Sequence, residues 1–138
     1  MKVKIVDFGL FQKSNGYEFS RDLNSEYVFD VYAIITSKKT RYVLLYISNI
    51  QVLNFFKLNG SLQIIDNRTN SKWCYTKSYS GGTHIYYSGG SYFQTIRYKD
   101  VNAPEWMISD KRFFLELIEK PEIAREKFFQ NEGTNMIR

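Results

Sequence analysis

The side chains best suited to nucleophilic chemistry are a single cysteine and a single histidine, Cys74 and His84. Both lie in Ser71–Lys99, where aromatic, β-branched and glycine residues alternate. A nucleophilic Cys–His pair requires contact between the two side chains and a third group that orients the imidazole. Strand alternation leaves the contact open, and the sequence offers no third group. We therefore interpret them as a buried thiol and a surface imidazole, with a hydrolase or nuclease that uses His84 as the minority alternative.

Other chemical motifs are also missing. One histidine, one cysteine and scattered carboxylates give no metal-ligand spacing. The glycine pairs 81–82 and 89–90 precede strand-like residues, which favours hairpin turns over a phosphate-binding loop. Asp30 lies within an apolar strand pattern, and we interpret it as a hydrogen-bonded or edge carboxylate. The sequence thus predicts a protein that is not an enzyme, with no catalytic residue, no metal and no cofactor.

Aromatic and cationic residues interleave in Ser71–Lys99, which predicts a binding surface. Such residues can stack on bases and hold phosphates. Tyrosine and arginine are also the residues that dominate protein–protein hot spots. Tyrosine is common in half-buried strands as well, so each position has a purely structural alternative. The predicted partner-binding residues are Lys72, Lys77, Tyr79, His84, Tyr86, Tyr92, Arg97 and Lys99.

The positive charge is concentrated in the first hundred residues. The net charge is +5, and residues 1–100 contribute 13 basic against 7 acidic side chains, whereas residues 101–138 contribute 6 against 7. An acidic protein surface and a nucleic acid are both possible partners for such a segment. A solvated surface with a lysine excess is the structural alternative.

Length and hydropathy indicate one domain over residues 1–138. A lone cysteine makes no internal disulfide. The first residues carry no signal-peptide pattern, and no run approaches a membrane span. We therefore expect a cytoplasmic protein without a membrane partner.

The periodicity predicts a β body over residues 1–100. About seven or eight short antiparallel strands at regular spacing are typical of a sandwich or a bent open barrel. Gln12–Ser25 is expected to be a polar loop and a candidate contact surface. The expected strands are Val3–Phe11 with a bulge near Asp7–Gly9, Tyr27–Thr36, Arg41–Ile47, the Asn59-Gly60 hairpin of Gln51–Leu58 and Ser61–Asp66, and three strands with two Gly-Gly turns in Ser71–Lys99.

Residues 101–138 have a helical pattern. Asn102 is the predicted cap, Pro104 lies in the first turn, and Pro121 precedes a closing helix over Glu122–Phe129. The apolar stripe is wide, so we expect these helices to pack on the sheet. The predicted fold class is therefore α+β, with a mostly antiparallel body and a C-terminal helical segment.

The segment Ala103–Phe129, APEWMISDKRFFLELIEKPEIAREKFF, resembles the ends of small bacterial immunity proteins. This family protects toxin-producing cells, including those with contact-dependent growth inhibition systems. The resemblance implies a non-catalytic cytosolic inhibitor that binds a cognate toxin domain, often a nuclease. The basic β body departs from the acidic character of many nuclease inhibitors. The alternative is a small basic module that binds RNA or single-stranded DNA.

Overall fold

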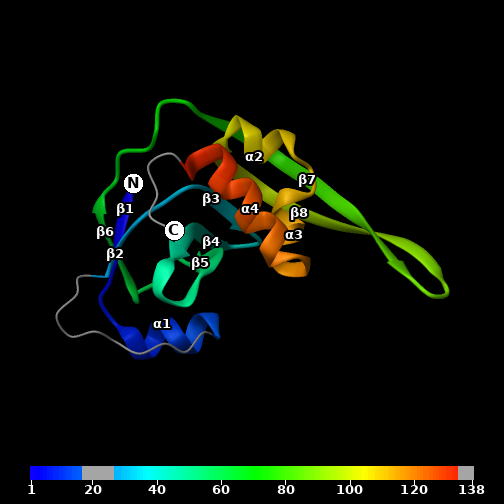
Figure 1. Ribbon diagram of the computed structural model, residues 1–138. Coiled ribbons are helices and arrows are strands. Elements are labelled where there is room, and N and C mark those ends of the chain that lie inside the picture. Colours follow the sequence, from blue (N-terminus) through cyan, green and yellow to red (C-terminus); the bar gives the residue numbers. More distant parts are fainter. Residues whose placement is uncertain (17–26, 134–138) are drawn as a thin grey trace.

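The computed structural model describes residues 1–16 and 27–133, and these form two antiparallel sheets and four α-helices (Figure 1). The predicted α+β class is confirmed. The sheets have three and five strands, and they do not close into a barrel. The chain order is β1 (Lys2–Ile5), α1 (Phe8–Asn15), β2 (Val28–Asp30), β3 (Ile34–Ser37), β4 (Thr40–Ile47), a 3-10 turn (Ser48–Ile50), β5 (Val52–Lys57), β6 (Leu62–Asp66), β7 (Trp73–Tyr87), β8 (Gly90–Pro104), α2 (Glu105–Ser109), α3 (Phe113–Glu119) and α4 (Pro121–Glu132).

The five-stranded sheet, in the order β5-β4-β3-β8-β7, separates two hydrophobic cores. On one face, Ile35 and Leu44 pack with buried residues of α2, α3 and α4. On the other face, Ile34 and Val43 pack with α1 and with the smaller sheet, in the order β2-β1-β6. Successive side chains of a strand point to opposite faces, so each of these strands is apolar on both sides. The helical segment therefore covers the sheet, as expected.

The predicted strand Tyr27–Thr36 is wrong as one strand. Its first part is β2, which pairs with β1, and its second part is β3, which pairs with β4 and β8. Between them the chain crosses from the three-stranded sheet to the five-stranded sheet. The Val31 N–H donates to the Met1 carbonyl at 2.9 Å, and the Tyr32 N–H donates to the Leu44 carbonyl at 3.0 Å. The sequence does not mark this crossing, because Val31 and Ala33 on either side of it are both apolar and buried.

The predicted hairpin at Asn59-Gly60 is also wrong, although both of its strands exist. β5 pairs with β4, whereas β6 pairs with β1 in the other sheet. The Asn59 side chain accepts hydrogen bonds from the Ser61 N–H at 2.9 Å and from the Ser61 hydroxyl at 2.6 Å. The turn chemistry was recognised correctly, but it joins two sheets rather than two paired strands.

The first predicted strand ends early, at Ile5, and its continuation is the helix α1. Asp7 is the N-cap, because its side chain accepts a hydrogen bond from the Leu10 N–H at 3.0 Å. Gly16, with φ of 75°, ends the helix through a bond to the Gln12 carbonyl. The expected bulge is therefore a helix cap, and the expected loop Gln12–Ser25 begins within a helix. Residues 17–25 of that loop lie outside the described part of the chain.

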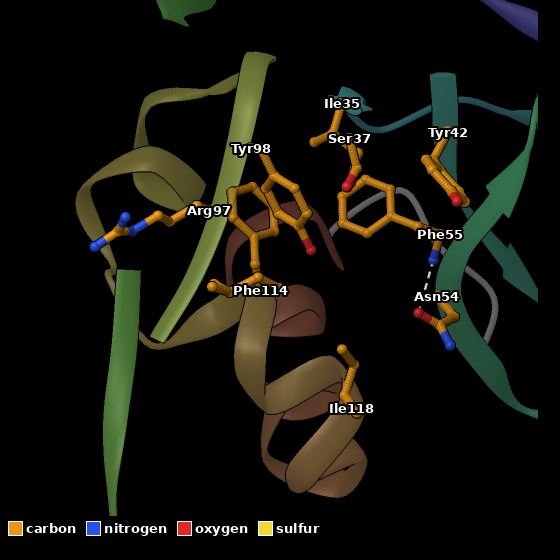
Figure 2. A pocket seen from close by; sticks show the side chains of 10 residues that line it. Ile35, Ser37, Tyr42, Asn54, Phe55, Arg97, Tyr98, Phe114 and Ile118 are labelled. Atoms are coloured by element: carbon orange, nitrogen blue, oxygen red, sulfur yellow. Dashed lines mark hydrogen bonds between the residues drawn. The ribbon is translucent and has the colours of Figure 1, made fainter. Parts of the chain in front are cut away.

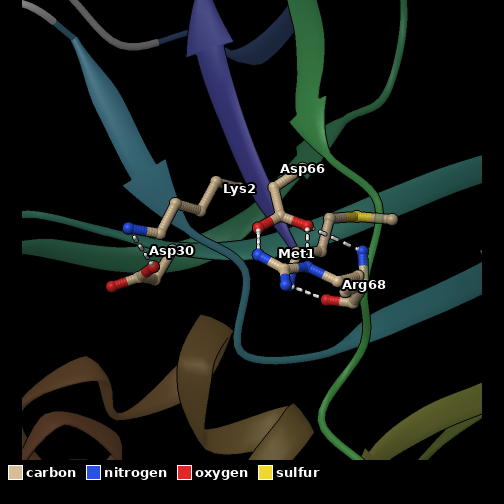
Figure 3. A network of polar contacts seen from close by, with 5 residues as sticks. All are labelled: Met1, Lys2, Asp30, Asp66 and Arg68. Atoms are coloured by element: carbon tan, nitrogen blue, oxygen red, sulfur yellow. Dashed lines mark hydrogen bonds and ion pairs between the residues drawn. The ribbon is translucent and has the colours of Figure 1, made fainter.

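Polar contacts tie the ends of the small sheet together (Figure 3). Arg68 donates two side-chain hydrogen bonds to Asp66, at 3.0 and 2.8 Å, and these lower the pKa of that carboxyl. The Met1 amino group donates to the Arg68 carbonyl. Asp30 lies on the edge strand β2, where Lys2 Nζ is 3.8 Å from its carboxylate. Asp30 therefore fits its structural interpretation as an edge carboxylate.

The helical segment starts later than the sequence predicts. Asn102 is not a cap, because it pairs with Ile34 and Tyr75 within the sheet, and the first helix begins at Glu105 after Pro104. The closing helix begins at Pro121 and continues to Glu132, which is longer than predicted. None of the described helices is long and apolar enough to cross a membrane.

Lys127 holds the helices together. Its ammonium group lies 2.9 Å from Asp110 and also contacts Glu116, whose side chain is buried. Burial acts against the charge of Lys127, but its hydrogen bonds to the two carboxylates outweigh this and raise its pKa. Trp106 Nε1 donates to Glu132 at 2.8 Å, which links α2 to the end of α4. The helical layer is thus locked by charged contacts as well as by its core.

Candidate functional site

Strands β7 and β8 form a long two-stranded ribbon whose tip projects beyond both sheets (Figure 1). Each strand has 15 residues, and one turn, Ser88-Gly89, joins them. The expectation of three strands with two Gly-Gly turns is therefore wrong. Gly81 and Gly82 lie inside β7, paired with Ile96 and Thr95.

The pair Gly81-Gly82 is explained by close packing rather than by a turn. A Cβ on Gly81 would lie 2.5 Å from the Lys111 carbonyl oxygen, and one on Gly82 would lie 2.3 Å from the Gln94 carbonyl oxygen. The Gly82 N–H donates to the Lys111 carbonyl at 2.7 Å. Gly81 thus lets the loop between α2 and α3 rest directly on the ribbon, and Gly82 lets β7 and β8 approach each other at Gln94.

The ribbon changes direction at Ser78, which has a left-handed φ of 54°. The ladder pairs Lys77 with Asp100 and Tyr79 with Tyr98, but leaves the Ser78 step unpaired. Tyr98 and Val101 both pack in the helical core although they are three residues apart. In a regular strand such residues point to opposite faces. The two faces of the ribbon are therefore exchanged at this step, and the side chains beyond it point to the opposite sides.

Beyond the glycines, residues 83–94 form what we call the arm, and its surface is aromatic on both faces. The exposed fractions are 77% for Tyr86, 58% for Tyr87, 51% for Tyr92 and 55% for Phe93. The His84 ring lies 5.1 Å from Phe93 and 6.1 Å from Tyr86, between centroids. On the opposite face the Tyr87 and Tyr92 rings are 5.9 Å apart. The arm is thus stabilised by ring contacts that are themselves open to solvent.

The arm carries no formal charge. Residues 78–96 include no Asp, Glu, Lys or Arg. The cations predicted for the site lie on either side of this neutral stretch, and the structure exposes all of them without an ion pair to any described residue: Lys72, Lys77, Arg97 and Lys99. Ser78, Ser80, Arg97 and Lys99 line an open hollow at the base of the arm. The predicted mixture of aromatics and cations is therefore separated. The aromatic rings lie on the arm, and the cations, which we call the cationic base of the arm, lie before and after it in the chain.

Tyr79 is buried, with 1% of its surface exposed, so it does not offer a partner the surface that we predicted. Its ring packs edge-on against Phe114 at 5.2 Å, and Lys111 Nζ lies 4.5 Å from its centroid. Burial, together with the nearby Asp110, raises the pKa of Tyr79 to about 12. Tyr79 therefore packs in the core that anchors the ribbon, and it is not part of the exposed surface of the arm.

The structure does not bring Cys74 and His84 together. Cys74 pairs with Ala103 at the foot of β7, whereas His84 pairs with Phe93 in the arm. Cys74 is exposed, contrary to the expected buried thiol, while His84 is at the surface as expected. No group of three or more His, Cys, Asp or Glu residues in the described ranges 1–16 and 27–133 could hold a metal ion.

A cavity of about 400 Å³ opens between the ribbon, β5 and α3, and no sequence pattern predicted it (Figure 2). Its walls are mainly apolar, with Phe55, Phe114 and Ile118 among them. Burial raises the pKa of Tyr98, which points into it. Arg97 is directed away from the cavity in Figure 2. The lining offers hydroxyl groups but no carboxylate, histidine or cysteine.

Comparison with known proteins gives no guide to this site. No protein-family model, curated protein or solved structure matches the chain. The arm and its cationic base must therefore be interpreted from their own chemistry.

Proposed function

We propose that this protein is a non-catalytic inhibitor that binds a cognate bacterial toxin domain through the arm. The supporting observation is a projecting ribbon with four exposed aromatic rings and no charged residue. The resemblance of Ala103–Phe129 to immunity proteins supplies the class of partner. A nuclease domain in the bacterial cytoplasm is the proposed target.

The exposed rings favour a protein partner. Tyrosine contributes a large, rigid contact area at low entropic cost, and it is enriched at binding hot spots. Tyr86 and Tyr92 lie on opposite faces of the arm, so inserting the arm into a cleft would bury both. A toxin cleft wide enough for a two-stranded ribbon is therefore the favoured complement.

The separation of charge from aromatics weakens the nucleic-acid alternative. Single-stranded nucleic acids are bound where cations follow the backbone beside the stacking rings. Here the nearest formal charges to the tip rings, Lys77 and Arg97, lie outside the neutral stretch. The cationic base is better suited to a rim contact with carboxylates of an acidic protein.

The test is co-expression with a toxin encoded by the neighbouring gene. We expect the protein to restore growth and to form a one-to-one complex with the purified toxin domain. Loss of rescue on deleting residues 83–94, with the rest of the fold retained, would assign the effect to the arm. Absence of both rescue and complex would overturn the proposal. Binding to oligonucleotides with a steep salt dependence would support the nucleic-acid alternative instead.

A further inference from the structure

The open edge of β7 in the arm is not protected against strand pairing. β7 is an edge strand, and beyond the Gly82 contact with Lys111 no backbone group of the described residues hydrogen-bonds to that edge; the Thr83 hydroxyl donates a long bond of 3.5 Å to the His84 carbonyl, which can accept a second one. The other edge strands are shorter and carry charges, namely Asp30 in β2, Lys57 in β5 and Asp66 in β6. Natural proteins protect edges with short strands, charges or proline. The arm has none of these devices.

The backbone groups available on this edge follow from the hairpin register. Tyr87 and Gly90 flank the two-residue turn, so they form a hydrogen-bonded pair, and the pairs then alternate along the ribbon. The N–H of Gly82 points outward, as its bond to Lys111 shows. By the same alternation, His84 and Tyr86 direct their N–H and C=O groups away from β8.

We propose that the arm pairs with the arm of a second copy of this chain, edge to edge along β7. An antiparallel pair about a twofold axis places His84 opposite Tyr86 of the second copy, and Tyr86 opposite the second copy's His84. Closed twofold dimers with one self-complementary patch are the commonest oligomers. The product is a four-stranded sheet in the order β8-β7-β7-β8.

Charge favours a second copy at this edge. Each chain has a net charge of +5, so two copies repel at most approaches, but residues 78–96 are neutral. The free edge of β8 continues directly into Arg97 and Lys99, which makes a twofold pair there less favourable. An isolated two-stranded ribbon is marginally stable in water, whereas three or more strands are stable. Pairing therefore stabilises the arm and extends its aromatic face.

Analytical ultracentrifugation of the free protein over a range of concentrations tests the inference. We expect a reversible monomer–dimer equilibrium. Proline is tolerated on edge strands whose N–H faces solvent, so His84→Pro removes a donor that the symmetric interface uses twice. We expect it to raise the dimer dissociation constant by about 30-fold or more. His84→Ala retains the N–H, and Ser91→Pro removes an outward N–H from the β8 edge, so both variants should still dimerise.

A wild-type protein that stays monomeric throughout, or a dimer indifferent to His84→Pro, would overturn the inference. If His84→Pro fails to fold by circular dichroism, Tyr86→Lys decides, because it places one lysine on each paired strand, diagonal to the lysine of the second copy, and charges on an edge strand oppose pairing. A dimer that Tyr86→Lys leaves intact contradicts pairing along β7. These measurements use the free protein, so their outcome is independent of toxin binding.

Discussion

The backbone N–H of Gly82 donates to the carbonyl of Lys111 at 2.7 Å, and this contact fastens the ribbon to the helical layer. It joins an edge strand to the loop between α2 and α3. Because it uses an outward-facing N–H of β7, it also closes the edge of the sheet at that point. The arm begins where this contact ends, so Gly82 separates the anchored part of the ribbon from the projecting part.

Substitution of Gly82 by alanine should therefore destabilise the protein. The added Cβ would meet the Gln94 carbonyl oxygen at 2.3 Å, and backbone cannot yield as a flexible side chain does. We expect a loss of about 2–3 kcal/mol in the free energy of unfolding, measured by urea denaturation. Gly9→Ala is the control, because its Cβ would find only an ordinary contact of 3.6 Å with Asp7. Equal stabilities for the two variants would contradict the packing explanation.

The two glycine pairs show what the sequence can and cannot predict. Both occur in Tyr-Ser-Gly-Gly, and both were expected to be turns. Gly89 does lie in the turn, but Gly81 is required by the loop that carries Lys111, some thirty residues away in the chain, and Gly82 by Gln94 of the paired strand β8. Local propensity describes the residue's own backbone and carries no information about what packs against it. The contact with Lys111 was therefore beyond sequence reasoning.

Removal of the Tyr79 hydroxyl should not destabilise the protein. The hydroxyl oxygen is buried and has no hydrogen-bond partner among the described residues. Leaving a polar group unpaired costs free energy that phenylalanine would not incur. We expect Tyr79→Phe to be neutral or to gain about 1 kcal/mol at pH 7 in urea denaturation. Tyr79→Ala, which deletes the buried ring, should lose about 3–5 kcal/mol. A clear loss for Tyr79→Phe would reveal an interaction that the geometry does not contain.

The same hydroxyl makes stability sensitive to alkaline pH. Burial, with Asp110 nearby, raises the pKa of Tyr79 from 10.0 to about 12. The unfolded chain then releases this proton first as the pH rises, so stability falls from about pH 10 until the folded form also ionises near 12. Urea denaturation at a series of alkaline pH values should show a shallower decline for Tyr79→Phe than for the wild type. Identical declines would exclude Tyr79 as a source.

Strand positions were predicted better than strand partners. The strand predicted at Arg41–Ile47 lies within β4, and β4 pairs with β3 directly before it in the chain. The break between β2 and β3 was missed, because Val31 and Ala33 are both apolar although they enter different cores. Asp7 did carry a readable signal: it caps the N–H of the third residue after it. Apolar alternation at Val3 and Ile5 obscured that cap.

Among the charged residues of the helices, substitution of Lys127 should lower the free energy of unfolding most. Its removal leaves Glu116, with 6% of its surface exposed, as a buried carboxylate without its cation. We expect Lys127→Met to lose about 2 kcal/mol of unfolding free energy. Adding Glu116→Gln should restore part of that loss, since the unpaired charge is then gone. Lys120→Met, at an exposed position, is the control and should change little. No recovery in the double variant would contradict the buried-charge explanation.

If the proposed toxin is the partner, the cationic residues beside the arm should govern how fast it binds. Arg97 and Lys99 are exposed beside the arm and make no ion pair with the described residues, so they can steer an acidic partner. The double variant Arg97→Gln, Lys99→Gln should slow association by about 10-fold at low salt and flatten its salt dependence. Lys13→Gln with Lys120→Gln changes the net charge equally at exposed positions outside the ribbon. If both pairs slow association alike, as measured by biolayer interferometry, net charge rather than the base is responsible.

The tip aromatics should govern how long the complex lasts. Tyr86 and Tyr92 are exposed on opposite faces of the arm, so each reports on one face. We expect alanine at either position to weaken toxin affinity by about 10-fold or more, mainly through faster dissociation. The free energy of unfolding should change by no more than about 1 kcal/mol, because these rings make only cross-strand contacts. Ile65→Ala removes an exposed apolar residue from β6, outside the ribbon, and should leave dissociation unchanged.

An effect confined to Tyr86 would assign the contact to the face that His84 and Phe93 share, and one confined to Tyr92 would assign it to the face of Tyr87. Wild-type dissociation in both alanine variants would exclude the arm as the binding element.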